Sequence, residues 1–337
     1  MGWDEISTSN LSHRSIIHSW RDKHSLFTAI EHGYRGILSH GFYLDHMSSS
    51  AHHYNNDLEL TTIFNEIQRQ RFLGGEACLW TEYIDSKMVH SRLWPRTAAI
   101  AERLWSSTVD SLDCMYNRLD QLDRTFFHPN DKQYIKNLAR FASNTKALKI
   151  LADFCEPLGL QGRDRTRNYT SDTPLNRFVD SLKPESEQTR RLIQTNDLPL
   201  LYSIFVQWKR NHLDLQSNES EIVQLSENLH RLSEIGLRLL KLFNDNPQGQ
   251  IVSSRWFNYQ KYIFDTLEYQ VPEIRLAAVT ILRNLLQQFH PCVFDLINLS
   301  LILFFPVIFI IVQRVTFIRR NLLLPCLNFC YYHCARC

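Results

Sequence analysis

The stretch "SIIHSWRDKHSLFTAIEHGYRGILS", residues 15–39, decides the predicted fold. Its two ends, "SIIHSW" and "RGILS", are short apolar runs with β-branched residues, which are typical of strands. Between them Ser25 can cap a helix through "LFTAIEH", and Gly33 can end it. Strand, helix and strand in this order form a βαβ unit, and such units indicate a parallel sheet.

The alternation of strand and helix continues to about residue 110. Asp57 can open a second helix, and "RFLGGEACLW" (71–80) then returns as strand and loop. The apolar face of that helix would consist of Leu60, Ile63, Phe64 and Ile67. Residues 1–110 are therefore predicted to form an α/β domain.

Residues 111–290 show a helical pattern. One apolar stripe with a period of 3.6 residues is typical of a helix packed in a bundle. It consists of Ile222, Leu225, Leu229, Leu232, Gly236, Leu239 and Phe243. We expect a helical C-terminal extension that carries no chemistry of its own.

Composition excludes one class of partner. Lys and Arg total 37 against 35 Asp and Glu, so the net charge of +2 gives no electrostatic reason to expect a nucleic acid. The N-terminus has no basic residue followed by an apolar run, so the sequence shows no signal peptide. The eight cysteines form no recognisable disulfide framework.

The tail, residues 291–337, is hydrophobic and rich in cysteine. Its segment 296–312 holds seventeen residues without a charge, the lower limit for a membrane span, and three arginines follow it. A buried helix, or sequence that does not belong to the gene product, explains the segment equally well. The closing cysteines could bind zinc or carry palmitate, but their spacing matches no standard zinc site, so we predict no metal.

Several aromatic residues in the first hundred are followed two places later by an acid, and three of these pairs are candidates for a sugar site. In an extended segment residues i and i+2 point to the same side, so each pair can offer one ligand a flat apolar face and a hydrogen-bond acceptor. A sugar ring uses both. The pairs are Trp3 with Glu5, Tyr43 with Asp45, and Trp80 with Glu82, and Trp20 lies on the intervening strand. If each pair closes a parallel strand, all gather at the C-terminal mouth of a barrel.

The segments "GGEACLWTEYID" (74–85) and "RLWPRTAAIAERLWSS" (92–107) closely resemble glycoside hydrolase family 20, the β-N-acetylhexosaminidases. The resemblance extends back through "ILSHGFYLD" and "IIHSW" to "GWDEI", and more loosely forward through "YTSDTPLNRFVDSLKP" (169–184). It covers roughly residues 1–245 and leaves the tail unmatched.

The resemblance implies a TIM (β/α)8 barrel with a sugar pocket walled by tryptophans, matched here by Trp3, Trp20 and Trp80. Tyr43 corresponds to the tyrosine that hydrogen-bonds the acetamido carbonyl of the substrate. Asp45 and Glu82 correspond to acids that hold sugar hydroxyls. The implied substrates are glycans ending in N-acetylglucosamine or N-acetylgalactosamine, and no cofactor is expected. The family mechanism is substrate-assisted and retaining, with the acetamido oxygen as nucleophile.

The family's catalytic Asp-Glu pair lies in a segment like His-x-Gly-Gly-Asp-Glu, and none of the 337 residues form such a segment. By resemblance Asp4 and Glu5 belong to the next strand, so we predict no catalytic residue in this chain. The predicted fold is α/β: the C-terminal portion of a TIM barrel, about four strands, followed by an all-α extension. Another chain could complete the barrel.

Two alternatives stay open at this point. One is a non-catalytic, membrane-anchored sugar-binding or interaction protein, and the other is a gene-model fragment with no stable product. The family and the tail together predict the lysosomal or secretory pathway, or a membrane, as the location.

Overall fold

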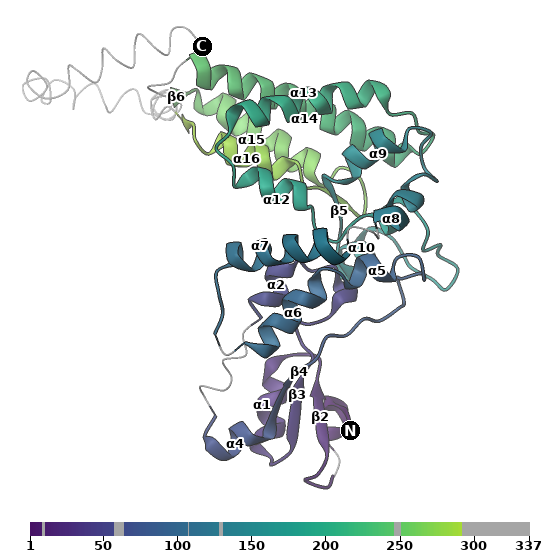
Figure 1. The fold of residues 1–337 in the computed structure, drawn as a ribbon, viewed down its shortest axis with the longest axis vertical. Coiled ribbons are helices and arrows are strands. Elements are labelled where there is room, and N and C mark those ends of the chain that lie inside the picture. Colours follow the sequence, from purple (N-terminus) through teal and green to yellow (C-terminus); the bar gives the residue numbers. More distant parts are fainter. Residues whose placement is uncertain (9–10, 57–63, 107, 128–130, 246–250, 292–337) are drawn as a thin grey trace, which may run out of the picture. The chain divides into compact units, whose positions relative to one another are not determined.

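The computed structural model describes residues 1–8, 11–56, 64–106, 108–127, 131–245 and 251–291 (Figure 1). The tail 292–337, with the predicted span 296–312, lies outside the described residues, as do Asp57 to Ile63 of the predicted second helix. Within the described ranges, no helix combines the length and the apolar character that crossing a membrane requires.

The described residues fall into two compact units. The first contains residues 1–187, 214–224 and 271–275. The second contains residues 188–213, 225–270 and the described residues from 276 onward. The predicted boundary near residue 110 therefore lies inside the first unit, because helices that follow it pack on the segment that precedes it.

A four-stranded parallel sheet forms the N-terminal part of the first unit, in the order β1-β2-β3-β4. Neighbours in the sheet are neighbours in the sequence, as the βαβ pattern predicts. Helix α1 (Lys23–Glu31) connects the second strand to the third. The strands are β1 (Gly2–Trp3), β2 (Ile16–Ser19), β3 (Arg35–Leu38) and β4 (Phe72–Gly75). The predicted βαβ unit is confirmed, and the described residues form one sheet of four parallel strands.

Helix α1 begins earlier than predicted. Its N-cap is Asp22, whose carboxylate accepts a hydrogen bond from the backbone N–H of Ser25 at 2.7 Å. Aspartate and serine are both favourable N-cap residues. Asp22 takes this position because its charged oxygen interacts more strongly with the free N–H groups of the first turn. Gly33 follows the C-cap with φ +88°, as the predicted helix end requires.

The core of the sheet lies between its face and α1. Leu26 and Ile30 of the helix are fully buried against Leu38 and Phe42. Gly36 of β3 permits this approach, because a Cβ there would lie 2.2 Å from the Leu26 side chain. Burying each of these side chains contributes ~1.5–3 kcal/mol.

The remaining elements of the first unit are mostly short helices. They are η1 (Asp4–Thr8), η2 (Leu44–His46), α2 (Ser50–Tyr54), α4 (Glu66–Arg71), α5 (Val89–Leu93), α6 (Arg96–Trp105), α7 (Leu112–Leu122), the π-helical turn η3 (Asp123–Phe127), α8 (Asp131–Leu138), α9 (Thr145–Ala152), β5 (Cys155–Pro157), α10 (Leu160–Thr166), α11 (Phe178–Ser181) and β7 (Ile274–Leu276).

Contacts across residue 110 explain why the first unit extends so far. Tyr116 of α7 accepts a hydrogen bond from the backbone N–H of Ala51 at 3.2 Å and donates its hydroxyl to Glu185 at 3.0 Å. Glu185 in turn accepts from the backbone N–H of Ser50, at the start of α2. Since these groups are largely buried, they join the two parts of the chain into one unit.

The second unit contains most of α12 (Glu187–Ile193), α13 (Leu198–Asp214) and α14 (Ser220–Asp245), whose residues 187, 214 and 220–224 belong to the first unit. It also contains β6 (Ile251–Val252), α15 (Ser254–Glu268), α16 (Val279–Leu286) and β8 (His290–Pro291). The predicted apolar stripe is confirmed on α14, where its leucines are buried. Figure 1 shows α13 and α14 running side by side, and Phe205 of α13 packs on Gly236 of α14.

The prediction of an all-α extension is wrong in detail. Strand β5 pairs with β7, and β6 pairs with β8 in parallel. These strands are two or three residues long, too short for the alternating pattern that reveals a strand in a sequence.

Candidate functional site

The residues predicted to bind sugar lie at the carboxyl edge of the parallel sheet. Trp3 ends β1, and Trp20 directly follows β2. Tyr43 and Trp80 lie in the loops that follow β3 and β4. Because parallel strands end at the same edge, the topology alone brings the four loops to one side of the sheet.

The loops after β3 and β4 continue the pairing of their strands. Tyr43 and Cys78 form a parallel bridge, in which Leu44 N–H donates to the Cys78 carbonyl at 2.8 Å. Two residues further along each loop, the backbone N–H of Trp80 donates to Asp45 Oδ1 at 3.2 Å. These contacts hold the two loops side by side, so Tyr43 and Asp45 lie close to Trp80 although they are distant in the sequence.

Two of the three predicted tryptophans contact each other. The rings of Trp3 and Trp80 lie 5.9 Å apart at an angle of 44°, and the Trp80 side chain is 45% exposed. Trp20 is instead held by the residues beside it: its Nε1 donates to Glu5 at 3.2 Å, and the Arg21 guanidinium lies over its ring. Among the described residues, Trp20 makes no ring contact with the other two.

Tyr43 is buried, and the ring of His46 stacks on it with the centroids 5.0 Å apart. Burial raises the pKa of the Tyr43 phenol far above its usual range, and the nearby Cys78 thiol adds to the rise. The hydroxyl therefore keeps its proton, so that it is a neutral hydrogen-bond donor of the kind that binds a carbonyl oxygen.

Asp45 is only 5% exposed, whereas Glu82 is exposed. Burial raises the pKa of Asp45, the hydrogen bond from the Trp80 backbone lowers it, and the negative charge of Glu82 raises it again. The two carboxyl groups are thus close enough to interact. Together they offer acceptor oxygens on the loops that carry Tyr43 and Trp80.

The adjacent acids at the start of the chain are engaged by one arginine. Arg21 Nη1 donates to Asp4 Oδ1 at 2.9 Å, and Arg21 Nη2 donates to Glu5 Oε1 at 2.6 Å. The pKa of Asp4 is raised, chiefly by burial. The pKa of Glu5 is lowered, chiefly by a hydrogen bond from its own backbone N–H. Glu5 is therefore ionised, which is the wrong state for a group that must donate a proton.

Comparison with known proteins identifies this region. Residues 1–108 match the catalytic domain of glycosyl hydrolase family 20. Residues 1–108 therefore resemble the catalytic domain of this family. It is 38% identical over 125 residues to human beta-hexosaminidase subunit beta and 32% identical over 111 residues to beta-hexosaminidase 3 of Arabidopsis thaliana. The matches cover 35% and 32% of this chain, but only 22% and 21% of the two relatives, so the chain spans about a fifth of their length.

A solved family 20 structure resembles a larger part of the chain. The chitobiase of Flavobacterium johnsoniae matches with a TM-score of 0.73 and 27% identity. The alignment covers 85% of this chain and 47% of the chitobiase, so it includes much of the helical extension. The α/β, helix-rich fold is therefore shared with a family 20 protein.

Four residues of the family 20 region were missed by the sequence analysis. Glu76 follows β4, and its Oε1 lies 2.5 Å from His18 Nδ1 and accepts from Ser39 Oγ at 2.7 Å and from Cys78 Sγ at 3.9 Å. Burial, and to a lesser degree the charge of Glu76, raises the pKa of the Cys78 thiol to about 11. Their place in the sequence, at the ends of predicted parallel strands, could have identified them, because polar residues at the carboxyl ends of such strands are often functional.

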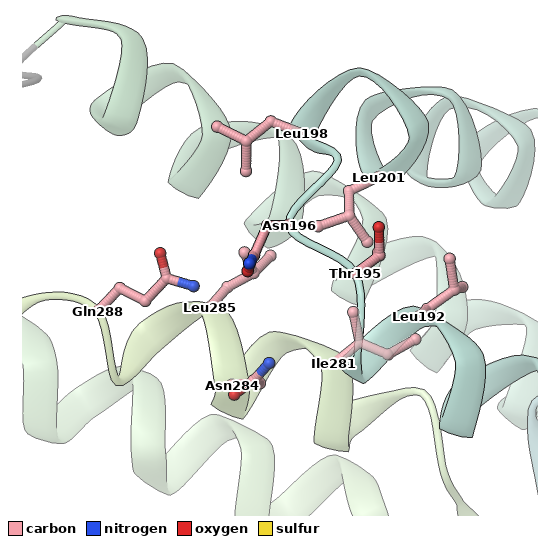
Figure 2. A pocket seen from close by; sticks show the side chains of 9 residues that line it. All are labelled: Leu192, Thr195, Asn196, Leu198, Leu201, Ile281, Asn284, Leu285 and Gln288. Carbon is pink, nitrogen blue, oxygen red and sulfur yellow. The ribbon is translucent and has the colours of Figure 1, made fainter. Parts of the chain in front are cut away.

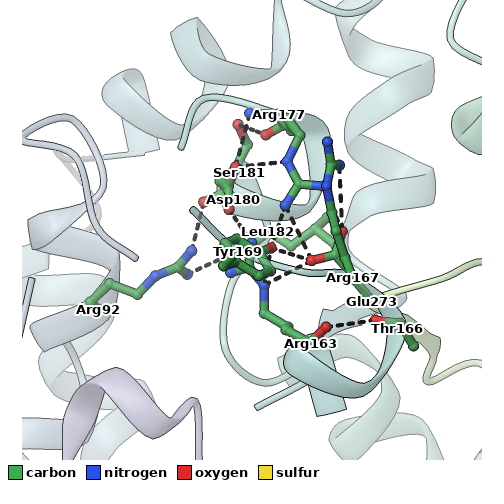
Figure 3. Close-up of polar contacts among 10 residues, drawn as sticks. All are labelled: Arg92, Arg163, Thr166, Arg167, Tyr169, Arg177, Asp180, Ser181, Leu182 and Glu273. Atoms are coloured by element: carbon green, nitrogen blue, oxygen red, sulfur yellow. Dashed lines mark hydrogen bonds and ion pairs between the residues drawn. The ribbon is translucent and has the colours of Figure 1, made fainter. Parts of the chain in front are cut away.

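The loop that carries Trp80 and Glu82 contacts a network of buried charges through Tyr83. Figure 3 shows the network itself. Tyr83 packs edge-on against Tyr169 with ring centroids 4.6 Å apart. The Tyr169 hydroxyl donates to Glu273, which also accepts from Arg177 at 2.5 Å and from Arg163 at 3.3 Å. Arg163 donates to Asp180 at 2.5 Å. Since its charges are paired within the protein, we assign this network to stability rather than to chemistry.

A cavity of about 180 Å³ lies in the second unit (Figure 2). Aliphatic side chains and uncharged polar groups line it, so it offers no group for acid–base chemistry. Its lining residues are Leu192, Thr195, Asn196, Leu198, Leu201, Ile281, Asn284, Leu285 and Gln288. Across the described part of the chain, no cluster of three or more His, Cys, Asp or Glu has metal-binding geometry.

Proposed function

We propose that this chain supplies the sugar-binding side of a β-N-acetylhexosaminidase pocket, which takes a terminal N-acetylglucosamine or N-acetylgalactosamine of a glycan. The four parallel strands would be the C-terminal portion of a (β/α)8 barrel. Among the described residues β1 and β4 form the two edges of the sheet, so closing a barrel needs further strands, which another polypeptide segment must supply.

The contact between Asp45 and the Trp80 backbone is the observation that carries this proposal. It places an apolar ring face, a protonated phenol and two carboxyl groups on the same pair of loops. A pyranose with an acetamido group needs these three: its C–H face packs on Trp80, its carbonyl accepts from Tyr43, and its hydroxyls donate to Asp45 and Glu82.

The chemical step of the family requires an acid that protonates the leaving oxygen, and a positioned acid contributes ~10²–10⁴-fold to the rate. Glu5 is held ionised in its ion pair with Arg21, and the resemblance places neither Glu5 nor Asp4 at the position of that acid. We therefore infer that the chain binds the terminal sugar and that the substrate-assisted, retaining step depends on acids outside these residues.

The test uses the full purified chain in two assays. Calorimetric titration with N-acetylglucosamine measures binding, and release of phenol from an aryl N-acetyl-β-glucosaminide measures turnover. Saturable binding without turnover is the expected result. Absence of binding by a folded chain refutes the proposal.

Turnover would require an acid within this chain, and the Glu5→Gln variant then decides whether Glu5 is that acid. A non-catalytic sugar-binding protein is the second candidate, favoured by the same Arg21 ion pairs. Adding the missing family segment in trans separates the two, because only an incomplete enzyme would gain activity. A lysosomal or secretory location remains a prediction for either.

A further inference from the structure

Trp3 and His18 are partners across the first pair of strands. They occupy opposite positions in the register of β1 and β2, and both precede the carboxyl edge of the sheet. Their rings meet edge to face, with centroids 5.1 Å apart and planes at 66°. Since His18 is only 7% exposed, its ring supports the Trp3 indole from within the protein.

Glu76 fixes the ring of His18 from the direction of β4, the strand at the opposite edge of the sheet from β1. The carboxylate begins at the end of β4, passes the end of β3 and approaches His18 Nδ1 on β2. Ser39, directly after β3, donates to the same oxygen at 2.7 Å. The Glu76 backbone N–H donates to the Leu38 carbonyl at 3.1 Å. The Glu76 carboxylate thus connects the ends of β4, β3 and β2. His18 in turn contacts Trp3 of β1.

The hydrogen bond to Glu76 sets both the tautomer and the rotation of the imidazole, because Nδ1 must carry the proton. Nε2 of His18 is buried and has no hydrogen-bond partner among the described residues. Leaving a buried nitrogen unpaired opposes folding, so a purely structural role would favour an apolar side chain at this position. The ring is useful here for its shape and fixed orientation beneath Trp3.

We propose that His18 and Glu76 are positioning residues of the sugar site: Glu76 holds the His18 ring, and His18 holds the Trp3 indole at the angle at which it meets Trp80. This inference rests on the proposed function and adds two residues to it. A pyranose packs on a preformed wall with less loss of side-chain freedom than on a mobile indole, so the pair acts on affinity without touching the sugar.

A double-mutant cycle tests the proposal with N-acetylglucosamine as the probe. His18→Leu should weaken binding about tenfold, and Trp3→Ala should weaken it more. Because His18 acts through Trp3, the double variant should bind no more weakly than Trp3→Ala alone. If the double variant lost affinity by the product of the two single-variant factors, His18 and Trp3 would act independently, and the proposal would be wrong. Glu76→Ala should resemble His18→Leu, whereas Glu76→Gln, which keeps an acceptor oxygen for His18, should retain most of the affinity.

A second measurement needs no sugar. The carbon-bound protons of His18 should show a ring-current shift in the proton NMR spectrum that Trp3→Ala removes and Glu76→Ala reduces. Unchanged His18 resonances in Trp3→Ala would refute the contact. If the shift is present but the wild-type chain binds no N-acetylglucosamine, the proposed function fails, while the positioning of Trp3 by His18 is supported.

Discussion

The Tyr83 hydroxyl donates a hydrogen bond to Asp164 Oδ1 at 3.0 Å. This bond connects the loop that carries Trp80 and Glu82 to α10, across 81 positions of the sequence. The guanidinium of Arg163, the preceding residue of α10, lies 5.9 Å from the Tyr83 ring centroid. The helical extension therefore positions one side of the candidate sugar site.

Tyr83→Phe should weaken binding of N-acetylglucosamine about fivefold while leaving the chain folded, because it removes one hydrogen bond that contributes about 1 kcal/mol. Calorimetric titration measures the loss. Tyr202→Phe is the matched control, since Tyr202 lies exposed on α13 of the other unit. Equal affinities of wild type and Tyr83→Phe would show that α10 does not position the loop.

Tyr43→Phe should weaken binding of N-acetylglucosamine but hardly change binding of glucose. The buried phenol keeps its proton, and in the proposed site it donates a hydrogen bond to the acetamido carbonyl, a group that glucose lacks. Titration of both sugars against both proteins measures this difference. Equal losses for the two sugars would assign Tyr43 to the shape of the pocket rather than to the acetamido group.

Trp80→Ala should abolish measurable binding of N-acetylglucosamine, because it removes the exposed ring that meets Trp3. The backbone N–H that donates to Asp45 remains, so the loop keeps that contact. Trp105→Ala, which removes a 93% exposed indole at the end of α6, is the control and should bind normally. Undiminished affinity in Trp80→Ala would exclude Trp80 from the site.

Local patterns were sufficient to predict the parallel sheet and the long helix α14. The β-branched runs of β2 and β3 and the 3.6-residue stripe of α14 are signals that neighbouring residues carry by themselves. The aromatic and acidic pairs were visible for the same reason. Their expected gathering at one edge followed from the parallel topology.

The contacts that complete the site could not be predicted from the sequence. Glu76 meets His18 across 58 positions, and Tyr83 meets Asp164 across 81. Neither pair has a periodic or spacing signal, since only the folded sheet and the docked α10 bring the partners together. The same limit explains why β5 and β7 were missed: their pairing depends on distant segments rather than on local propensity.

Gly236→Ala should destabilise the protein by ~1–3 kcal/mol, although alanine is the better helix former by about 1 kcal/mol. A Cβ at position 236 would lie 2.6 Å from the Phe205 ring, so α13 and α14 would have to move apart. Urea denaturation measures the free energy of unfolding. A more stable Gly236→Ala variant would mean that the Phe205 ring yields at little cost.

Glu273→Gln should destabilise the protein by ~3–5 kcal/mol at neutral pH, because it leaves Arg163 and Arg177 without one of their carboxylate partners. The glutamate is 3% exposed, and although burial opposes its charge, hydrogen bonds from Arg177 and Tyr169 lower its pKa to about 2. Glu31→Gln, at an exposed position of α1, is the matched control and should have little effect.

The pH dependence of this loss follows from the lowered pKa of Glu273. The ordinary value of 4.5 applies to the unfolded chain, so the ionised carboxylate contributes its full ~3 kcal/mol of stability above pH 4.5. The contribution decreases as the pH falls and is lost as the pH passes through about 2. The difference in free energy of unfolding between wild type and Glu273→Gln should therefore narrow from pH 6 to pH 3. A difference that stays constant over this range would show that the glutamate is not held ionised by its arginine partners.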